Sequence, residues 1–296
     1  MNILAIDVGG TFIKYGIYDR NAQTLCSVNQ IKTPKAGLDD FVQTIKKLRE
    51  EAGDISGVAM SLPGTIDSDT GFVYQGGNLS YNDKQNLAEI LKETLLCPVT
   101  LENDARCAAL AELWKGSLVG VQNALVLVIG TGLGGAVIQN GRLYKGSHLY
   151  AGELSYLSTK GIDSYGMDTT LGAQISIPYF VDKCSEKLGR QLEGPELFSI
   201  LEKGCPKLQQ DFDEYLRNFA QQIFNFQFAF DPEKIVFGGG ISKNEFFLNS
   251  LKQYVEAFYQ KLPFPLEHSL GVCRFGNSAN LLGAVKHYLE KEELDA

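Results

Sequence analysis

Asparagine and aspartate stand side by side at Asn103-Asp104, where an extended run ends and an alanine-rich segment begins. Both residue types favour the first turn of a helix, because their side chains accept hydrogen bonds from unpaired backbone N–H groups. Helix capping is therefore one interpretation of the pair. The other interpretation is chemical, since a carboxylate within hydrogen-bond reach of an alcohol can take its proton as a general base.

Three glycine-rich turns elsewhere in the chain favour the chemical interpretation. Each turn follows an apolar run, and they lie at residues 7–11, 130–135 and 238–242. Such a turn lets the backbone approach a phosphate closely, because glycine has no side chain. Together with Asp104, the turns predict a base that deprotonates a hydroxyl group beside a bound nucleotide. Each turn taken alone is also compatible with a purely structural role.

The first of these turns carries residues suited to both a phosphate and a metal ion. Gly9, Gly10 and Thr11 form the turn itself, and Lys14 lies just beyond it, placed to face either phosphate or solvent. Mg²⁺ prefers carboxylate and water ligands, so Asp7 is a candidate to hold this ion through water. No Gly-x-x-x-x-Gly-Lys-Ser/Thr occurs, which excludes a P-loop, and the protein-kinase signatures are absent as well.

Composition and charge exclude several classes of function. The chain has 296 residues, of which 44% are hydrophobic and 21% charged, as in an ordinary globular protein. The formal net charge is −8 and no basic tract occurs, so we expect no nucleic-acid partner. No apolar run approaches the length of a membrane-spanning helix, and no signal peptide is recognisable. Six scattered cysteines and three distant histidines indicate reduced thiols in the cytoplasm and no zinc site.

Strands and helices alternate along the chain and place the candidate residues at strand ends. Apolar runs predict strands at residues 3–8, 12–18, 57–62, 99–101, 124–129, 136–139, 142–144, 234–237 and 271–275. Helical spacing predicts helices at residues 38–53, 87–95, 105–114, 173–188, 195–203, 212–230, 246–260 and 279–289. Residues 150–173 lack periodicity and are expected to form a loop-rich segment. This alternation predicts an α/β protein.

Six motifs together resemble those of the ROK family of sugar kinases. They stand in the order seen in that family: Asp7-Val8-Gly9-Gly10-Thr11, Ser61-Leu62-Pro63-Gly64, Glu102-Asn103-Asp104, Gly130-Thr131-Gly132-Leu133-Gly134-Gly135, Gly152-Glu153 and Gly238-Gly239-Gly240-Ile241-Ser242. The resemblance covers essentially the whole chain, through residues 281–284. It implies the actin/hexokinase-like (ribonuclease H-like) ATPase fold, in which two α/β domains flank a cleft.

The size of the chain and the loop after residue 116 divide it into two expected domains. We place the N-terminal domain at residues 1–116 and the larger C-terminal domain at residues 117–278. Given the resemblance, the closing helix at residues 279–291 is expected to pack back on the first domain.

The resemblance also implies a role for each residue of the acceptor site. Asp104 is the expected general base, taking the proton from a sugar hydroxyl as that hydroxyl attacks the γ-phosphate of ATP. Asn103 and Glu153 are expected to bind neighbouring hydroxyls, with a backbone contact from Gly64.

On the nucleotide side, the resemblance implies that ATP binds mainly to the second domain. Thr131, Gly132 and Gly134 are expected to meet the phosphates of ATP, and Gly239 and Gly240 its nucleoside. Mg²⁺ is the expected metal cofactor.

The chain departs from the family pattern after Glu153. Most ROK proteins continue with Gly-His and a Cys-x-Cys-Gly cluster that binds zinc together with that histidine. Here the chain reads Leu-Ser-Tyr, and no cysteine lies between Cys107 and Cys184, so no zinc is expected. Tyr156 is the candidate to replace the histidine's sugar contact, and Asp168 corresponds to a later sugar-binding glutamate of the family. Alternatively, Tyr156 packs in the interior and Asp168 caps a helix.

The zinc-less pattern resembles a branch with β-glucoside kinases and N-acetylmannosamine kinases, beside the glucokinases of the family. We therefore expect ATP-dependent phosphorylation of a hexose-type 6-hydroxyl, with glucose, a β-glucoside or N-acetylmannosamine as the acceptor. Two other functions are weighed against it: a sugar-responsive transcriptional regulator of the ROK type and a non-catalytic sugar sensor. Acidic charge opposes the regulator. The resemblance suggests a homodimer. Membrane and nucleic-acid partners are not expected, because of the short apolar runs and the acidic charge.

Overall fold

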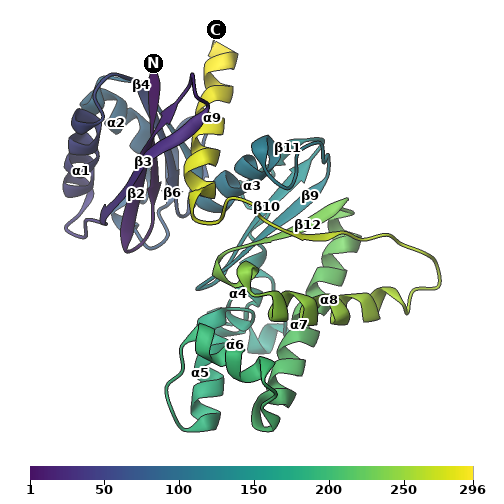
Figure 1. Cartoon of the computed structure of the whole chain (residues 1–296). Coiled ribbons are helices and arrows are strands. Elements are labelled where there is room, and N and C mark those ends of the chain that lie inside the picture. The colour runs from purple at the N-terminus through teal and green to yellow at the C-terminus, as the bar shows by residue number, and fades with distance from the viewer. Residues whose placement is uncertain (296) are drawn as a thin grey trace. The chain divides into compact units, whose positions relative to one another are not determined.

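The structure, a computed structural model, describes residues 1–295 and divides the chain into two α/β units (Figure 1). Unit 1 consists of residues 1–119, residues 145–150 and the chain from residue 277 onward, whereas unit 2 consists of residues 120–144 and 151–276. Residues 145–150 thus lie in unit 1, although they fall inside the second domain expected from the sequence. No helix in the described part of the chain is long and apolar enough to cross a membrane.

The main sheet of unit 1 has the strand order β3-β2-β1-β4-β8. Its strands are β1 (Asn2–Val8), β2 (Phe12–Asp19), β3 (Thr24–Lys32), β4 (Ile55–Leu62) and β8 (Val99–Asn103). β1 pairs antiparallel with β2 but parallel with β4, which in turn pairs parallel with β8. The carboxyl ends of β1, β4 and β8 therefore meet at one edge of the sheet, where Asp7, Ser61 and Asn103 lie.

Helices cover both faces of this sheet (Figure 1). α1 (Leu38–Glu51) and α2 (Leu87–Leu95) pack on the face that carries Leu4 and Ile6, and α3 (Asp104–Lys115) and α9 (Ala279–Asp295) on the face of Ile3 and Ala5. A small sheet of β5 (Thr65–Asp67), β6 (Phe72–Gln75) and β7 (Gln85–Asn86) and the short helix η1 (Ser80–Asn82) complete the unit. The alternation of side chains along β1 explains how one strand supplies both apolar cores.

The sheet of unit 2 has the strand order β11-β10-β9-β12-β13. Its strands are β9 (Ala124–Ile129), β10 (Leu133–Gln139), β11 (Arg142–Tyr144), β12 (Lys234–Gly238) and β13 (Leu270–Val272). β10 begins three residues before its predicted start, because Gly134 and Gly135 pair with Val128 and Leu127. The glycine turn between β9 and β10 is therefore shorter than expected.

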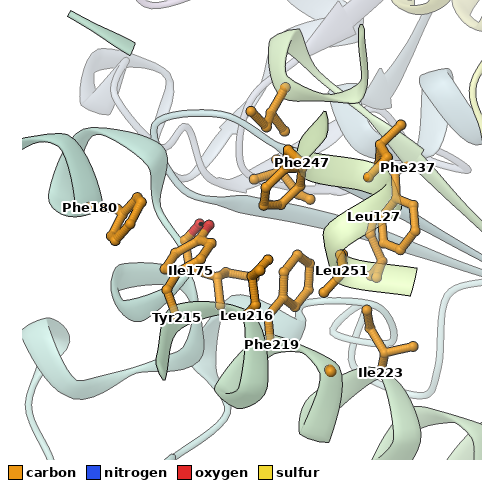
Figure 2. Packing of buried hydrophobic residues seen from close by; sticks show 14 of the residues in the cluster. Leu127, Ile175, Phe180, Tyr215, Leu216, Phe219, Ile223, Phe237, Phe247 and Leu251 are labelled. Atoms are coloured by element: carbon orange, nitrogen blue, oxygen red, sulfur yellow. Dashed lines mark hydrogen bonds between the residues drawn. The ribbon is translucent and has the colours of Figure 1, made fainter. Parts of the chain in front are cut away.

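A large aromatic core packs the helices of unit 2 against its sheet. The helices are α4 (Leu171–Gln174), α5 (Ile177–Leu188), α6 (Gly194–Glu202), α7 (Pro206–Phe230) and α8 (Glu245–Tyr259), with the short helices η2 (Leu154–Tyr156), η3 (Ile162–Ser164), η4 (Met167–Thr169) and η5 (Gly240–Lys243). A further short helix, η6 (Gly276–Ser278), lies where the chain passes from unit 2 to unit 1. Figure 2 shows Phe219 and Leu251 packed with Phe237 of β12. The rings of Phe219 and Phe237 meet edge to face, with centroids 6.1 Å apart.

The sequence analysis predicted no strand at β3 or at the three strands of the small sheet, β5, β6 and β7, and it predicted one helix where the structure has two. The strand β3 was not predicted, because most of its side chains are exposed and no apolar alternation marks it. The single helix predicted at residues 173–188 is two helices, α4 and α5, that are separated at Ile175-Ser176. The Ser176 hydroxyl caps the second of them by accepting a hydrogen bond from the Tyr179 N–H.

Candidate functional site

Asn103 and Asp104 lie at the junction of β8 and α3. Asn103 is the N-cap of α3, and its Oδ1 accepts a hydrogen bond of 3.1 Å from the Arg106 N–H. Its Nδ2 donates a hydrogen bond of 3.0 Å to the Gly64 carbonyl oxygen. The capping interpretation thus holds for Asn103, and the cap fixes the start of the helix. Asp104 follows as the first helical residue and is half-buried, with Oδ1 accepting the Ala105 N–H at 2.8 Å.

Glu102 supports this junction from inside the unit, a role that the sequence analysis did not assign. Its side chain is completely buried, and Oε1 accepts a hydrogen bond of 2.8 Å from the Asn103 N–H. Oε2 accepts another, of 2.9 Å, from the Ser68 hydroxyl. Arg106 and Lys145 provide the positive charges nearest to this carboxylate. The buried charge is therefore paired, as a charge in a protein interior must be.

Asp7 lies at the end of β1, at the same edge of the sheet. Its Oδ1 accepts hydrogen bonds of 3.0 Å from the Ser61 hydroxyl and from Asn280 Nδ2. Burial raises the pKa of Asp7 above its usual value, and the Asn280 hydrogen bond and the positive charge of Lys14 partly offset this increase. A nearby cation favours the charged form of such a carboxylate. Asp7 offers a carboxylate, a ligand type that Mg²⁺ prefers, and its role in holding this ion through water stays a prediction.

The roles of Ser61 and Asn280 beside Asp7 were missed by the sequence analysis. Asn280 stands 273 residues from Asp7 at the start of α9, and no local pattern connects the two positions. Ser61 lies in the family-like Ser-Leu-Pro-Gly stretch, but its type alone indicates no partner. Only the parallel pairing of β1 with β4, which sets Asp7 opposite Ser61, brings the two side chains together.

The turn at residues 9–11 is tied to the chain that follows β3. The Gly9 carbonyl accepts a hydrogen bond of 2.6 Å from the Thr33 hydroxyl. Lys35 donates from Nζ to the Gly10 carbonyl, which brings a cation to the turn that the sequence analysis did not identify. Thr11 is exposed beside them. Lys14 lies in β2 opposite Asp7, so its charge is placed next to this carboxylate.

In unit 2, the two remaining glycine turns lie side by side. The backbone of Gly239 approaches β9 so closely that a Cβ there would lie 2.0 Å from the Ile129 carbonyl oxygen, and its φ of +83° favours glycine. Gly240, the next residue, has open space around it. Thr131 and Gly132 are exposed in the turn after Ile129. The structure thus brings together two stretches that are more than a hundred residues apart.

Gly134, the remaining residue expected near the phosphates, is not in a turn. It lies in β10 and pairs with Val128 of β9. The turn before it is closed by a hydrogen bond of 3.0 Å from the Gly130 N–H to the Gly132 carbonyl. The Ile177 N–H, at the start of α5, donates to the Gly130 carbonyl at 3.3 Å. The first turn of a helix of twelve residues therefore borders the predicted phosphate turn.

Glu153 is positioned by the close approach of two backbone segments. A Cβ at Gly135 would lie only 2.3 Å from the Gly152 carbonyl oxygen, so the chain before Glu153 packs directly on β10. Glu153 itself is half-buried. The side chain of Tyr156, three residues on, is 48% exposed, so it does not pack in the interior. Asp168 is exposed in η4, and the side chain that caps the following helix belongs to Thr170.

The site residues thus form two groups, each within one unit. Unit 1 holds the acceptor candidates Gly64, Asn103 and Asp104, together with Asp7 and its glycine turn. Unit 2 holds the two other glycine turns and Glu153, Tyr156 and Asp168. Residues 1–295 contain no group of three or more His, Cys, Asp or Glu side chains arranged to hold a metal ion. A carboxylate at a helix start and exposed glycine turns are the parts that proton abstraction and phosphate binding require.

Comparisons with known proteins give one consistent match along the whole chain. The model of the ROK family matches residues 3–291. A β-glucoside kinase of Listeria monocytogenes is 31% identical over 296 residues, which cover 99% of each chain. A solved structure from Listeria monocytogenes, described as a candidate N-acetylmannosamine kinase, is 30% identical with a TM-score of 0.91, covering 99% of this chain and 100% of that one. A Streptococcus pneumoniae ROK family protein in complex with sucrose is 32% identical with a TM-score of 0.89, at the same coverage.

Proposed function

The chain belongs to the ROK family, and from that premise we propose that it transfers the γ-phosphate of ATP to the 6-hydroxyl of a hexose. Relatives along the whole chain are named β-glucoside kinase and glucokinase, so it is a phosphotransferase with an alcohol group as acceptor, of the actin/hexokinase-like fold. The sugar-responsive regulator has less support from these relatives. The observation that carries the proposal is Asp104, held at the first turn of α3 by the Asn103 cap.

Asp104 acts as the general base in the proposed reaction. As the sugar oxygen attacks the γ-phosphorus, the bond to the bridging oxygen of ADP breaks and the hydroxyl proton passes to the Asp104 carboxylate. Asn103 and Glu153 orient the sugar through its neighbouring hydroxyls, and Gly64 adds a backbone contact. Positioning contributes strongly to phosphoryl transfer, because the attacking oxygen, the γ-phosphorus and the leaving oxygen have to lie roughly on one line.

The nucleotide is assigned to the glycine turns. Exposed backbone at Thr131 and Gly132 receives the phosphates, with Gly134 behind them in β10, and Gly239 and Gly240 receive the nucleoside. The turn at residues 9–11 and Lys14 contact the phosphates from unit 1. When bound, Mg²⁺ neutralises charge on the phosphates, and Asp7 holds the ion through water. No zinc requirement is proposed, because the family's Cys-x-Cys-Gly cluster is missing from the sequence.

A β-glucoside is the proposed acceptor among the alternatives that the sequence left open. The Listeria relative is named a β-glucoside kinase, and this name supports the choice. The rings of Tyr156 and Tyr165, which are 48% and 46% exposed, stand after Glu153 in the chain. Such rings can stack against the second ring of a glucoside. Tyr156 thereby takes the place of the family's histidine, and Asp168 supplies a further hydroxyl contact.

Replacing the base while keeping its shape tests the proposal. Asp104→Asn is expected to lower kcat roughly 10²–10⁴-fold, the usual contribution of a general base, while the Kd for the sugar changes little. Asp39→Asn is the matched control, because Asp39 is also an aspartate in the first turn of a helix but is exposed in α1. Near-normal turnover in Asp104→Asn would exclude Asp104 as the base.

A phosphorylation screen identifies the acceptor and separates the enzyme from a non-catalytic sensor. Glucose, cellobiose, N-acetylmannosamine, N-acetylglucosamine and fructose are compared by ATP consumption. The highest kcat/KM is expected for cellobiose, the β-glucoside of the set. A preference for N-acetylmannosamine contradicts the assigned acceptor, and no turnover with any sugar contradicts the kinase.

We assign the protein to the cytoplasm, in line with its six free cysteines. We also propose a homodimer, in line with the family resemblance. Size-exclusion chromatography with light scattering measures the oligomeric state directly.

A further inference from the structure

A buried ionic cluster adjoins the Asn103-Asp104 junction. This Glu102 cluster consists of Glu102, Arg106, Lys145 and Ser68. The Glu102 carboxylate lies 3.6 Å from Arg106 Nη1 and 3.5 Å from Lys145 Nζ. Lys145 also donates a hydrogen bond to the Ser68 hydroxyl, which in turn donates to Glu102. Glu102 is completely buried and Arg106 is 3% exposed, so neither charge tolerates the loss of its partner.

One side of the Glu102 cluster holds the proposed base in place. Glu102 precedes Asn103-Asp104 and accepts the Asn103 N–H, whereas Arg106 follows the pair and donates its N–H to the Asn103 side chain. The two residues thus bracket the pair. Any shift of the cluster is transmitted to the backbone that carries Asp104.

The other side of the Glu102 cluster holds residues 145–150. Lys145 begins this segment, and Arg106 Nη2 donates a hydrogen bond to the Leu149 carbonyl near its end. The segment belongs to unit 1, although the chain before it and after it belongs to unit 2. Both ends of the segment are therefore anchored on residues that bracket Asp104.

The anchored segment leads directly to Glu153, which the proposed function places on the sugar. Glu153 stands four positions after Leu149, and a chain extended over four positions spans at most about 14 Å. Fixing Leu149 therefore restricts the positions that Glu153 can take. We propose that Lys145 is a positioning residue for the acceptor: through Glu102 it fixes residues 145–150, and through them Glu153. This inference rests on the proposed function, and Lys145 acts through the segment rather than on the reacting atoms.

Removing the charge of Lys145 tests the inference. In Lys145→Met, the KM for the sugar is expected to rise roughly tenfold to a hundredfold, the scale of a small misplacement in a site, while the KM for ATP stays near its wild-type value. Lys145→Arg keeps the charge and is expected to restore most of the loss. Lys291→Met is the matched control, because Lys291 pairs with Asp69 at 2.7 Å, a carboxylate that Lys145 also faces at 3.9 Å.

Amide hydrogen exchange gives a second readout that needs no activity. Exchange over residues 145–153 is expected to be faster in Lys145→Met than in wild type, and unchanged in Lys291→Met. Should Lys145→Met fail to fold, Ser68→Ala replaces it, because that change removes the hydroxyl between Lys145 and Glu102. A smaller shift in the same direction is then expected.

Several outcomes overturn the inference. The inference is wrong if the KM for the sugar in Lys145→Met equals the wild-type value. It is also wrong if the KM for ATP rises as much as the KM for the sugar, or if Lys145→Arg raises the KM for the sugar as much as Lys145→Met does. If the wild-type protein phosphorylates no sugar, the proposed function fails, and hydrogen exchange alone decides the role of Lys145. Unchanged exchange over residues 145–153 then overturns it.

Discussion

The buried carboxylate of Asp7 has a proposed function and also lowers the free energy of unfolding when it is ionised. It is buried at the end of β1, where Ser61 and Asn280 both donate to its Oδ1. Burial raises its pKa, which means that the folded state binds the proton more tightly than the unfolded state does. The neutral carboxyl of Asp7 therefore adds to the free energy of unfolding at pH values below 3.8, its pKa in the unfolded chain. This contribution is lost as the pH rises through the pKa of the folded state. Above the folded pKa, the ionised carboxylate is less favourable for folding than the neutral form.

We therefore expect Asp7→Asn to separate stability from activity. The amide oxygen can still accept both hydrogen bonds, and the buried charge is gone, so the free energy of unfolding at pH 7 should be equal or higher. Between pH 4 and pH 7, the free energy of unfolding should decrease less in Asp7→Asn than in wild type. The kcat should fall by a factor on the order of 10² or more, because Mg²⁺ loses its carboxylate. Urea unfolding at both pH values and kinetics over a range of Mg²⁺ concentrations measure these effects.

A clear decrease in the free energy of unfolding of Asp7→Asn contradicts this prediction, because it means that the hydrogen bonds from Ser61 and Asn280 depend on the negative charge of Asp7. Ser61→Ala provides the comparison. It removes one hydrogen bond to Asp7 but leaves the carboxylate, so Mg²⁺-dependent activity should be retained in part. The two variants together distinguish loss of the ligand from loss of its support.

At the residue scale, the sequence predicted side chains better than it predicted their partners. Asn103 and Asp104 stood out because of their types and their place before an apolar helix. Glu102 stood beside them without an assigned role, since burial and charge pairing are tertiary properties. Lys145 is still harder to find, because it meets Glu102 only after the chain has passed through β9, β10 and β11.

At the scale of elements, strongly periodic segments were predicted well and exposed ones poorly. The amphipathic helix α1 and the apolar strand β9 match their predicted positions closely, because one regular pattern of burial determines each. β3 lacks such a pattern, and its position follows from pairing with β2. The break between α4 and α5 depends on the Ser176 cap, which competes with a continuous helix in a way that apolar spacing does not reveal.

The junction of β12 with η5 allows a test of the nucleotide turn. At Gly239, alanine would clash with the Ile129 carbonyl oxygen and adopt a strained φ, so Gly239→Ala should lower the free energy of unfolding by about 1–3 kcal/mol or more. At Gly240 nothing lies within 4 Å, so Gly240→Ala should fold normally. There the new methyl group occupies space assigned to the nucleoside, and the KM for ATP should rise roughly tenfold.

Chemical denaturation and ATP kinetics on the two alanine variants form a matched pair. They differ by one position in the chain but affect different properties. If Gly240→Ala binds ATP as wild type does, the assignment of the nucleoside to this turn is wrong. A stable Gly239→Ala variant would show that β9 and the turn can separate at little cost.

At the scale of the whole molecule, three segments of chain build unit 1 and two build unit 2, so the chain passes between the units four times. The two α/β units follow from the alternation of strands and helices. The return of residues 145–150 to unit 1 does not, because this short segment contains no helix or strand and is held by side-chain contacts, among them those of Lys145 with Glu102 and of Leu149 with Arg106. Local patterns carry no information about such a connection.

The proposed assignment of ATP to the glycine turns and of the sugar to the start of α3 predicts that each substrate protects its own set of segments from amide hydrogen exchange. A non-hydrolysable ATP analogue with Mg²⁺ should slow exchange at residues 7–12, 129–135 and 238–243, because binding to the folded state suppresses local opening. Cellobiose alone should slow exchange at residues 101–107 and 145–153 and leave residues 238–243 unchanged.

Asp104→Asn provides the control for the exchange experiment, because it is expected to bind both substrates without turning them over. Its protection pattern should match that of wild type for each ligand. Protection of residues 238–243 by the sugar alone would place the acceptor at the turn that we assign to the nucleotide. Protection of residues 101–107 by the nucleotide but not by the sugar would remove Asp104 from the acceptor site.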